Sequence, residues 1–147
     1  MTADPFDPDR FLAAQAPVMA DVQRELSAGC KRTHWMWFVF PQLAGLGHSD
    51  MARRYALASL DDARAYLAHP VLGPRLRDCV TRVNQTTGRS AHEIFGSPDD
   101  RKFQSSMTLF HRAGPGEAAY GDALQRYYGG REDERTIALL AGNSPSA

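Results

Sequence analysis

A dense aromatic segment at residues 34–42, with a polar side chain at each end, is the first candidate for chemistry. It reads His-Trp-Met-Trp-Phe-Val-Phe-Pro-Gln. Small-molecule sites are commonly walled by aromatic rings, with a few convergent polar groups that orient the ligand. An alternative interpretation is that these rings simply form the centre of the core. If the segment lines a pocket, the residues that line it are His34, Trp35, Trp37 and Gln42.

A second candidate lies at residues 99–108. The chain has 15 Arg and only 2 Lys, so Lys102 stands out as a compact ammonium in a chain that otherwise uses guanidinium groups. Ser105 and Ser106 follow at i+3 and i+4, and a serine on a buried helix face needs a polar partner. We therefore expect Lys102, Ser105 and Ser106 at a polar cavity. The alternative is a surface lysine paired with an acid, small packing serines, and Asp99 and Asp100 as capping acids.

Arg53 belongs to an Arg-Arg-Tyr run on a short predicted helix. Two consecutive helical arginines face different directions, so at most one of them points inward. An inward Arg53 would hold a phosphate or carboxylate through two parallel hydrogen bonds. A solvated surface pair is the alternative.

Other common site chemistries find no support in the sequence. The five histidines, at positions 34, 48, 69, 92 and 111, never lie four residues apart as helical zinc ligands do. Phosphate-loop, dinucleotide-binding and nucleophile-elbow motifs are lacking. We therefore expect no metal and no cofactor.

The elements that must position these residues are predicted to be helices. The chain holds 21 Ala and 13 Leu but only 8 Val and Ile together, which favours helix over sheet. Helix starts are marked by Asp7-Pro8, Ser49 or Asp50, Ser59, Ser90, Ser97-Pro98 and Asp133 or Glu134. The apolar run at 34–40 fits a buried strand or a buried helix equally by periodicity, but no partner strand is evident, so we predict a short helix ended by Pro41.

The predicted architecture is all-α, a single compact orthogonal bundle of about eight short helices. Its predicted limits are residues 4–142, with flexible termini at 1–3 and 143–147. The 147 residues carry 17 basic and 17 acidic side chains, and this zero net charge lacks the electrostatic footprint of a nucleic-acid binder. Two distant cysteines, no signal peptide and no long apolar run indicate a cytoplasmic protein without a membrane partner.

Several runs together resemble a bacterial family of unknown function, domain-of-unknown-function family 1810. They are Asp-Pro-Phe-Asp at 4–7, Lys-Arg-Thr-His-Trp-Met-Trp-Phe-Val-Phe-Pro-Gln at 31–42, Ala-Arg-Arg-Tyr at 52–55, Glu-Ile-Phe-Gly-Ser-Pro-Asp-Asp at 93–100 and Ser-Ser-Met-Thr-Leu-Phe at 105–110. The resemblance covers about residues 4–140. It implies an all-α single domain and no established activity. Family members are sometimes labelled calpastatin, but calpastatin is a disordered repeat protein, and this chain is ordered and free of repeats.

A fainter similarity links the aromatic segment and the later Lys-Phe-Gln to small helical N-glycosidases of ribosylated pyrimidines or ADP-ribose. Those enzymes place a glutamate beside the aromatic segment, where this sequence has His34. Cleavage of an N-glycosidic bond usually needs a carboxylate, so the difference weakens that interpretation.

Three functional hypotheses follow. The leading one is a domain that binds a small ligand or a partner through a pocket walled by residues 34–42. The second is a hydrolase of N-glycosides, nucleotides or ADP-ribose derivatives that uses Gln42, Lys102 and a serine near His34. The third is a protein-interaction module without a pocket, whose partner the sequence does not identify.

Overall fold

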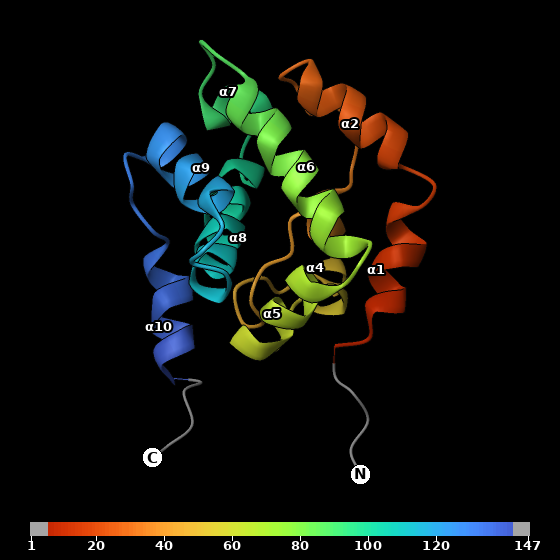
Figure 1. Ribbon diagram of the computed structural model, residues 1–147, viewed down its shortest axis with the longest axis vertical. Coiled ribbons are helices and arrows are strands. Elements are labelled where there is room, and N and C mark those ends of the chain that lie inside the picture. Colours follow the sequence, from red (N-terminus) through yellow and green to blue (C-terminus); the bar gives the residue numbers. More distant parts are fainter. Residues whose placement is uncertain (1–5, 143–147) are drawn as a thin grey trace.

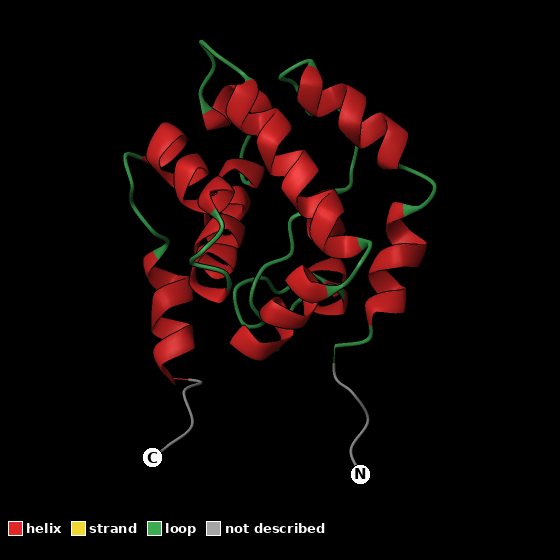
Figure 2. Cartoon of the chain, in the orientation of Figure 1, coloured by secondary structure: helices red, strands yellow, loops and turns green. Residues whose placement is uncertain are grey.

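Ten helices lie within residues 6–142, the part of the chain that the computed structural model describes (Figure 1). They are α1 (Pro8–Gln15), α2 (Met19–Ser27), α3 (Met36–Val39), α4 (Asp50–Arg54), α5 (Leu60–Ala68), α6 (Leu72–Gln85), α7 (Ala91–Phe95), α8 (Asp99–Ala113), α9 (Ala118–Tyr128) and α10 (Glu134–Gly142). Over these residues Figure 2 shows helices joined by loops and no strand. The all-α prediction is confirmed. The ten helices compare with about eight predicted, and the three shortest, α3, α4 and α7, coincide with short helices that the sequence predicts.

Several helix starts follow the predicted chemistry. The side chains of Ser49, Ser59 and Ser90 accept backbone N–H groups at the first turns of α4, α5 and α7, which would otherwise lack partners. Ser90 also completes a reciprocal capping box with Glu93. Asp7 precedes α1 as predicted, but its side chain makes no capping hydrogen bond.

Helices α6 and α8 organise the packing. Helix α6 packs against α1, α2, α5 and α9, while α8 packs against α5, α7, α9 and α10. Figure 1 shows α6 running diagonally between α2 and α9. One face of α8 buries a continuous set of rings and aliphatic chains, including Phe103, Met107 and Phe110. This rigid helix fixes the residues at its first turn, where part of the candidate site lies.

The aromatic segment is mostly core. Trp35 and Phe40 are fully buried, and Phe40 packs edge-on against Phe95 and Phe103 at ring separations of 5.9 and 5.0 Å. Such pairs add to the free energy gained from burying the rings themselves. The prediction of a short buried helix is confirmed by α3, which ends just before Phe40 and Pro41. The domain limits 4–142 stay a prediction, and the termini expected to be flexible lie outside the described residues.

Candidate functional site

A cleft of about 180 Å³ lies where the loop after α3 meets the starts of α8 and α10. Three segments far apart in the sequence contribute to it. Its lining residues are Gln42, Leu46, Gly47, Pro98, Arg101, Lys102, Ser105, Asp133 and Arg135. Three of these are cationic and one is acidic, so the cleft has an excess of positive charge in a chain whose net charge is zero.

The loop at 42–47 is held by backbone hydrogen bonds to residue 57. The Leu57 N–H donates to the Gln42 carbonyl oxygen at 2.9 Å, and the Ala44 N–H donates to the Leu57 carbonyl oxygen at 2.8 Å. Gly47 is required by close packing, since a Cβ there would lie 2.5 Å from the Cβ of Ala52. These contacts place the Gln42 side chain at the cleft on an anchored backbone.

Asp133 joins the start of α10 to the middle of α8. Its Oδ2 accepts the Thr136 N–H at 3.0 Å and the Thr136 hydroxyl at 2.6 Å, and Ser105 Oγ lies 3.1 Å away. The Asp133 N–H donates to Thr108 Oγ1 at 2.8 Å. Of the two predicted starts of the last helix, Asp133 and Glu134, Asp133 has the N-cap geometry. The same contacts explain why Ser105 is buried with a polar partner.

The two lysines of the chain share one carboxylate. Lys31 Nζ lies 3.0 Å from Asp99 Oδ2, and Lys102 Nζ lies 3.5 Å from Asp99 Oδ1. Each ammonium also lies over an indole ring, Lys31 over Trp35 at 5.0 Å and Lys102 over Trp37 at 5.3 Å from the ring centroid. Asp99 and Asp100 both lie in the first turn of α8, as predicted, although Pro98 rather than Ser97 occupies the cap position and makes no side-chain hydrogen bond. Asp100 Oδ1 accepts the Arg101 N–H at 2.9 Å, whereas the Asp99 carboxylate is engaged by the two ammonium groups.

The structure brings together three of the eight predicted site residues and separates the other five. Gln42, Lys102 and Ser105 line the cleft. Those outside its lining are His34, Trp35, Trp37, Arg53 and Ser106. The expectation of a pocket walled by the 34–42 segment therefore needs correction, since Gln42 alone of that segment lines the cleft.

Each of the five has a physical reason to lie elsewhere. Trp35 and Ser106 are fully buried in the core, whereas His34 and Arg53 are exposed. Trp37 is half-buried and touches the site only through the Lys102 ammonium above its ring. The aromatic segment folds as a tight helical turn that directs most of its rings inward, so its polar end at His34 points to solvent.

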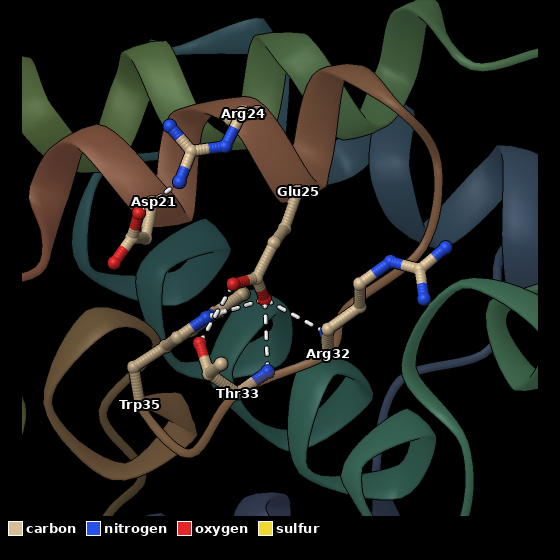
Figure 3. A network of polar contacts seen from close by, with 6 residues as sticks. All are labelled: Asp21, Arg24, Glu25, Arg32, Thr33 and Trp35. Carbon is tan, nitrogen blue, oxygen red and sulfur yellow. Dashed lines mark hydrogen bonds and ion pairs between the residues drawn. The ribbon is translucent and has the colours of Figure 1, made fainter.

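Glu25, on α2, is a buried carboxylate that the sequence patterns missed. Figure 3 shows its carboxylate surrounded by Arg32, Thr33 and Trp35. Oε1 accepts the backbone N–H groups of Arg32 at 2.7 Å and Thr33 at 3.0 Å and the indole N–H of Trp35 at 3.0 Å, and Oε2 accepts the Thr33 hydroxyl at 2.7 Å.

The four hydrogen bonds set the protonation state of Glu25. Burial raises the pKa of this carboxyl, but the hydrogen bonds to its charged form outweigh burial and lower the pKa from 4.5 to about 2. At neutral pH the carboxylate is thus charged, and it connects α2 to the loop at 31–35. Its spacing from Val22 and Leu26, on the apolar stripe of α2, is the sequence signal that indicates its burial.

Comparison with known proteins identifies the family. The family model described as "Protein of unknown function (DUF1810)" matches residues 5–140. The chain belongs to this family. A solved family-like structure, titled as the conserved hypothetical protein Rv1873 from Mycobacterium tuberculosis, shares 60% sequence identity with a TM-score of 0.92. The match covers 94% of this chain and 99% of that one. No curated protein matches.

Two further observations bear on the chemistry of this family member. Within residues 6–142, no three His, Cys, Asp or Glu side chains gather as metal ligands would. None of the helices in that range has the length and apolar character needed to span a membrane. The polar side chains that line the cleft are three cations, one amide, one hydroxyl and one carboxylate.

Proposed function

We propose that this protein binds a small anionic ligand, carrying a phosphate or a carboxylate, in the cleft between the loop at 42–47 and the starts of α8 and α10. The observation that carries the proposal is the convergence of Arg101, Lys102 and Arg135 on one cleft. Guanidinium and ammonium groups are the usual partners of phosphate and carboxylate oxygens, and charge-assisted hydrogen bonds are about twice as strong as neutral ones.

The three cations differ in how free they are to meet a ligand. The Arg101 side chain is exposed and forms no hydrogen bond or ion pair with residues 6–142. Arg135 spends one N–H group on the Leu46 carbonyl oxygen, at 3.1 Å, and a guanidinium has five. Lys102 shares Asp99 with Lys31, so its charge is only partly neutralised. Arg101 is therefore the group most available to an anion.

The size of the cleft favours a small ligand. Sites for drug-sized molecules measure about 300–1,000 Å³, whereas this cleft is about 180 Å³. The surface offers less support for an interaction module, because Val71, 38% exposed, is the single large hydrophobic side chain that is strongly exposed among residues 6–142. Protein interfaces usually have an apolar centre.

The second candidate function is hydrolysis of an N-glycoside or nucleotide derivative, and the carboxylate of Asp133 is the observation that favours it. This residue supplies, in the same cleft as Gln42 and Lys102, the kind of carboxylate that the aromatic segment lacks. Glycoside hydrolysis, however, usually uses a pair of carboxylates, and Asp133 is the one acid that lines the cleft. We therefore place binding ahead of catalysis.

The test is a thermal-shift and calorimetric titration with inorganic phosphate, citrate, nucleoside monophosphates and ribosylated bases, followed by product analysis of each stabilising compound. We expect phosphate-bearing compounds to raise Tm, and Arg101→Gln to weaken their binding about five-fold. Arg53→Gln is the matched control, because Arg53 is equally exposed but lies outside the cleft.

The outcomes separate the hypotheses. Equal weakening by Arg101→Gln and Arg53→Gln would place any anion binding outside the cleft and refute the proposal. Recovery of the bound compound intact supports a binding protein. Release of a free base by the unmodified protein, and no release by Asp133→Asn, would refute the binding proposal in favour of the hydrolase.

A further inference from the structure

The two carboxylate oxygens of Asp133 have different surroundings. Oδ2 receives all three contacts, from Thr136 N, Thr136 Oγ1 and Ser105 Oγ. Oδ1 accepts no hydrogen bond from any of residues 6–142. Because Oδ2 is fixed by the helix start, the carboxylate cannot turn freely, and Oδ1 keeps its lone pairs for another donor.

Asp133 is not used to neutralise the cations around it. No ion pair within the described chain joins Asp133 to Arg101, Lys102 or Arg135, although all four line the same cleft. The negative charge of Asp133 repels an anion that enters the same cleft, and its Oδ1 is left without a hydrogen-bond donor. Both costs are offset if the ligand that carries the anion also carries a hydrogen-bond donor for Oδ1. The cleft therefore contains two subsites. The first, formed by Arg101, Lys102 and Arg135, prefers an anion, and the second, at Asp133 Oδ1, prefers a hydrogen-bond donor.

Gln42 extends the acceptor and donor capacity of the second subsite. Its backbone carbonyl is occupied by the Leu57 N–H, while its side-chain amide lines the cleft and forms no hydrogen bond with residues 6–142. An amide accepts and donates at once, as a hydroxyl group does. Asp133 and Gln42 together suit a ligand with neighbouring hydroxyl groups.

We infer that the ligand is a phosphorylated sugar or polyol, with its phosphate on Arg101, Lys102 and Arg135 and a hydroxyl donating to Asp133 Oδ1. This inference rests on the proposed anion-binding function and names its ligand class. The volume of about 180 Å³ suits a single sugar phosphate and is smaller than the sites that hold drug-sized ligands. A site built to hydrogen-bond a hydroxyl rejects an analogue that lacks it, because its polar groups are then left without partners.

The experiment compares four probes by calorimetry: ribose 5-phosphate, ethyl phosphate, ribose and inorganic phosphate. The expected result is that ribose 5-phosphate binds at least about ten-fold tighter than ethyl phosphate. Asp133→Asn should reduce this ratio to near one. Its amide oxygen keeps the contacts with Thr136, so α10 stays capped, while an N–H₂ group replaces the acceptor. Ethyl phosphate should bind more tightly to this variant, because a negative charge has been removed.

Asp122→Asn is the matched control, since it removes the same charge from an exposed position on α9. It should leave the ratio unchanged. If ribose 5-phosphate and ethyl phosphate bind equally to the unmodified protein, the inference is overturned while the anion-binding function stands. If none of the phosphate probes binds, the inference is overturned, and the anion-binding function is overturned with it if citrate also fails to bind.

Discussion

Glu25 and Asp133 are both carboxylates held by a threonine hydroxyl and a backbone N–H, but their surroundings differ. Glu25 is 7% exposed, and both of its oxygens accept hydrogen bonds. Asp133 lines a cleft, and within residues 6–142 every hydrogen bond to its carboxylate falls on Oδ2. Glu25 tethers the loop that leads into the aromatic segment, whereas Asp133 caps a helix and keeps one oxygen available.

The difference separates a structural charge from a binding charge. A buried charge is tolerated when hydrogen bonds replace its lost hydration, and removing such a group leaves its donors without partners. A carboxylate oxygen at a cleft that accepts no hydrogen bond from the protein keeps its lone pairs available to a ligand. On this argument, changes at Glu25 should act on stability and changes at Asp133 on ligand selection.

The largest expected effect is that of Glu25→Ala. It leaves the N–H groups of Arg32, Thr33 and Trp35 without their acceptor, and we expect a loss of about 3 kcal/mol in the free energy of unfolding. The measurement is urea denaturation, with a fall in Tm of about 10 °C as a second readout. Glu134→Ala, at an exposed acid of α10, is the control. A loss below about 1 kcal/mol would show that water replaces the carboxylate and would break the contrast with Asp133.

Much of the fold is predictable from local chemistry. Ser49, Ser59 and Ser90 mark helix starts because a serine oxygen satisfies N–H groups within three residues, which is a local interaction. The composition, rich in Ala and Leu, indicates the all-α class for the same reason. The short helix before Pro41 follows from the lack of a partner strand.

The site is harder to predict because it depends on contacts between distant segments. Lys102 and Ser105 are recognisable as unusual residues on one helix, yet Arg135 and Asp133 resemble an ordinary helix start, and only tertiary packing brings all four to one cleft. The converse error concerns the aromatic segment. Its rings suit a pocket wall and a core equally well in composition, and packing against Phe95 and Phe103 assigns them to the core.

The second-largest expected effect is a fall in the free energy of unfolding at acid pH, caused by protonation of Glu25. Its pKa is about 2 in the native state and 4.5 as the ordinary value. A lowered native pKa means that the carboxylate stabilises the fold fully above about pH 4.5 and that this stabilisation is lost as the pH falls toward 2. We expect a loss of about 2 kcal/mol over this interval.

The check is urea denaturation at several pH values for the unmodified protein and for Glu25→Gln, which has no titrating group at this position. The variant should be less stable at pH 6 and show a shallower decline below pH 4.5. Parallel curves for the two proteins would show that Glu25 does not control acid stability.

Asp133→Ala should cost about 1 kcal/mol, the usual cost of a lost N-cap. The Thr136 N–H and hydroxyl lose their acceptor at the first turn of α10. Asp133→Asn should cost much less, since its amide oxygen still caps the helix. Denaturation of the two variants side by side measures the difference. If Asn is as costly as Ala, the charge of Asp133 serves the fold, and the distinction between the two carboxylates is lost.

The smallest expected effect compares the two threonines. Among the residues that the structure describes, Thr33 donates the sole hydrogen bond to Glu25 Oε2, whereas Thr136 donates to an Asp133 oxygen that has two further contacts. Thr33→Val should therefore cost about 0.5–1 kcal/mol at neutral pH. It should also move the acid transition to higher pH, because losing a hydrogen bond to the charged form raises the pKa of Glu25. Thr136→Val is the matched control and should leave the acid transition in place. Thr33 bonds to Glu25 and Thr136 does not. Equal shifts of the acid transition in both variants would therefore mean that the shift comes from a general loss of stability and not from the pKa of Glu25.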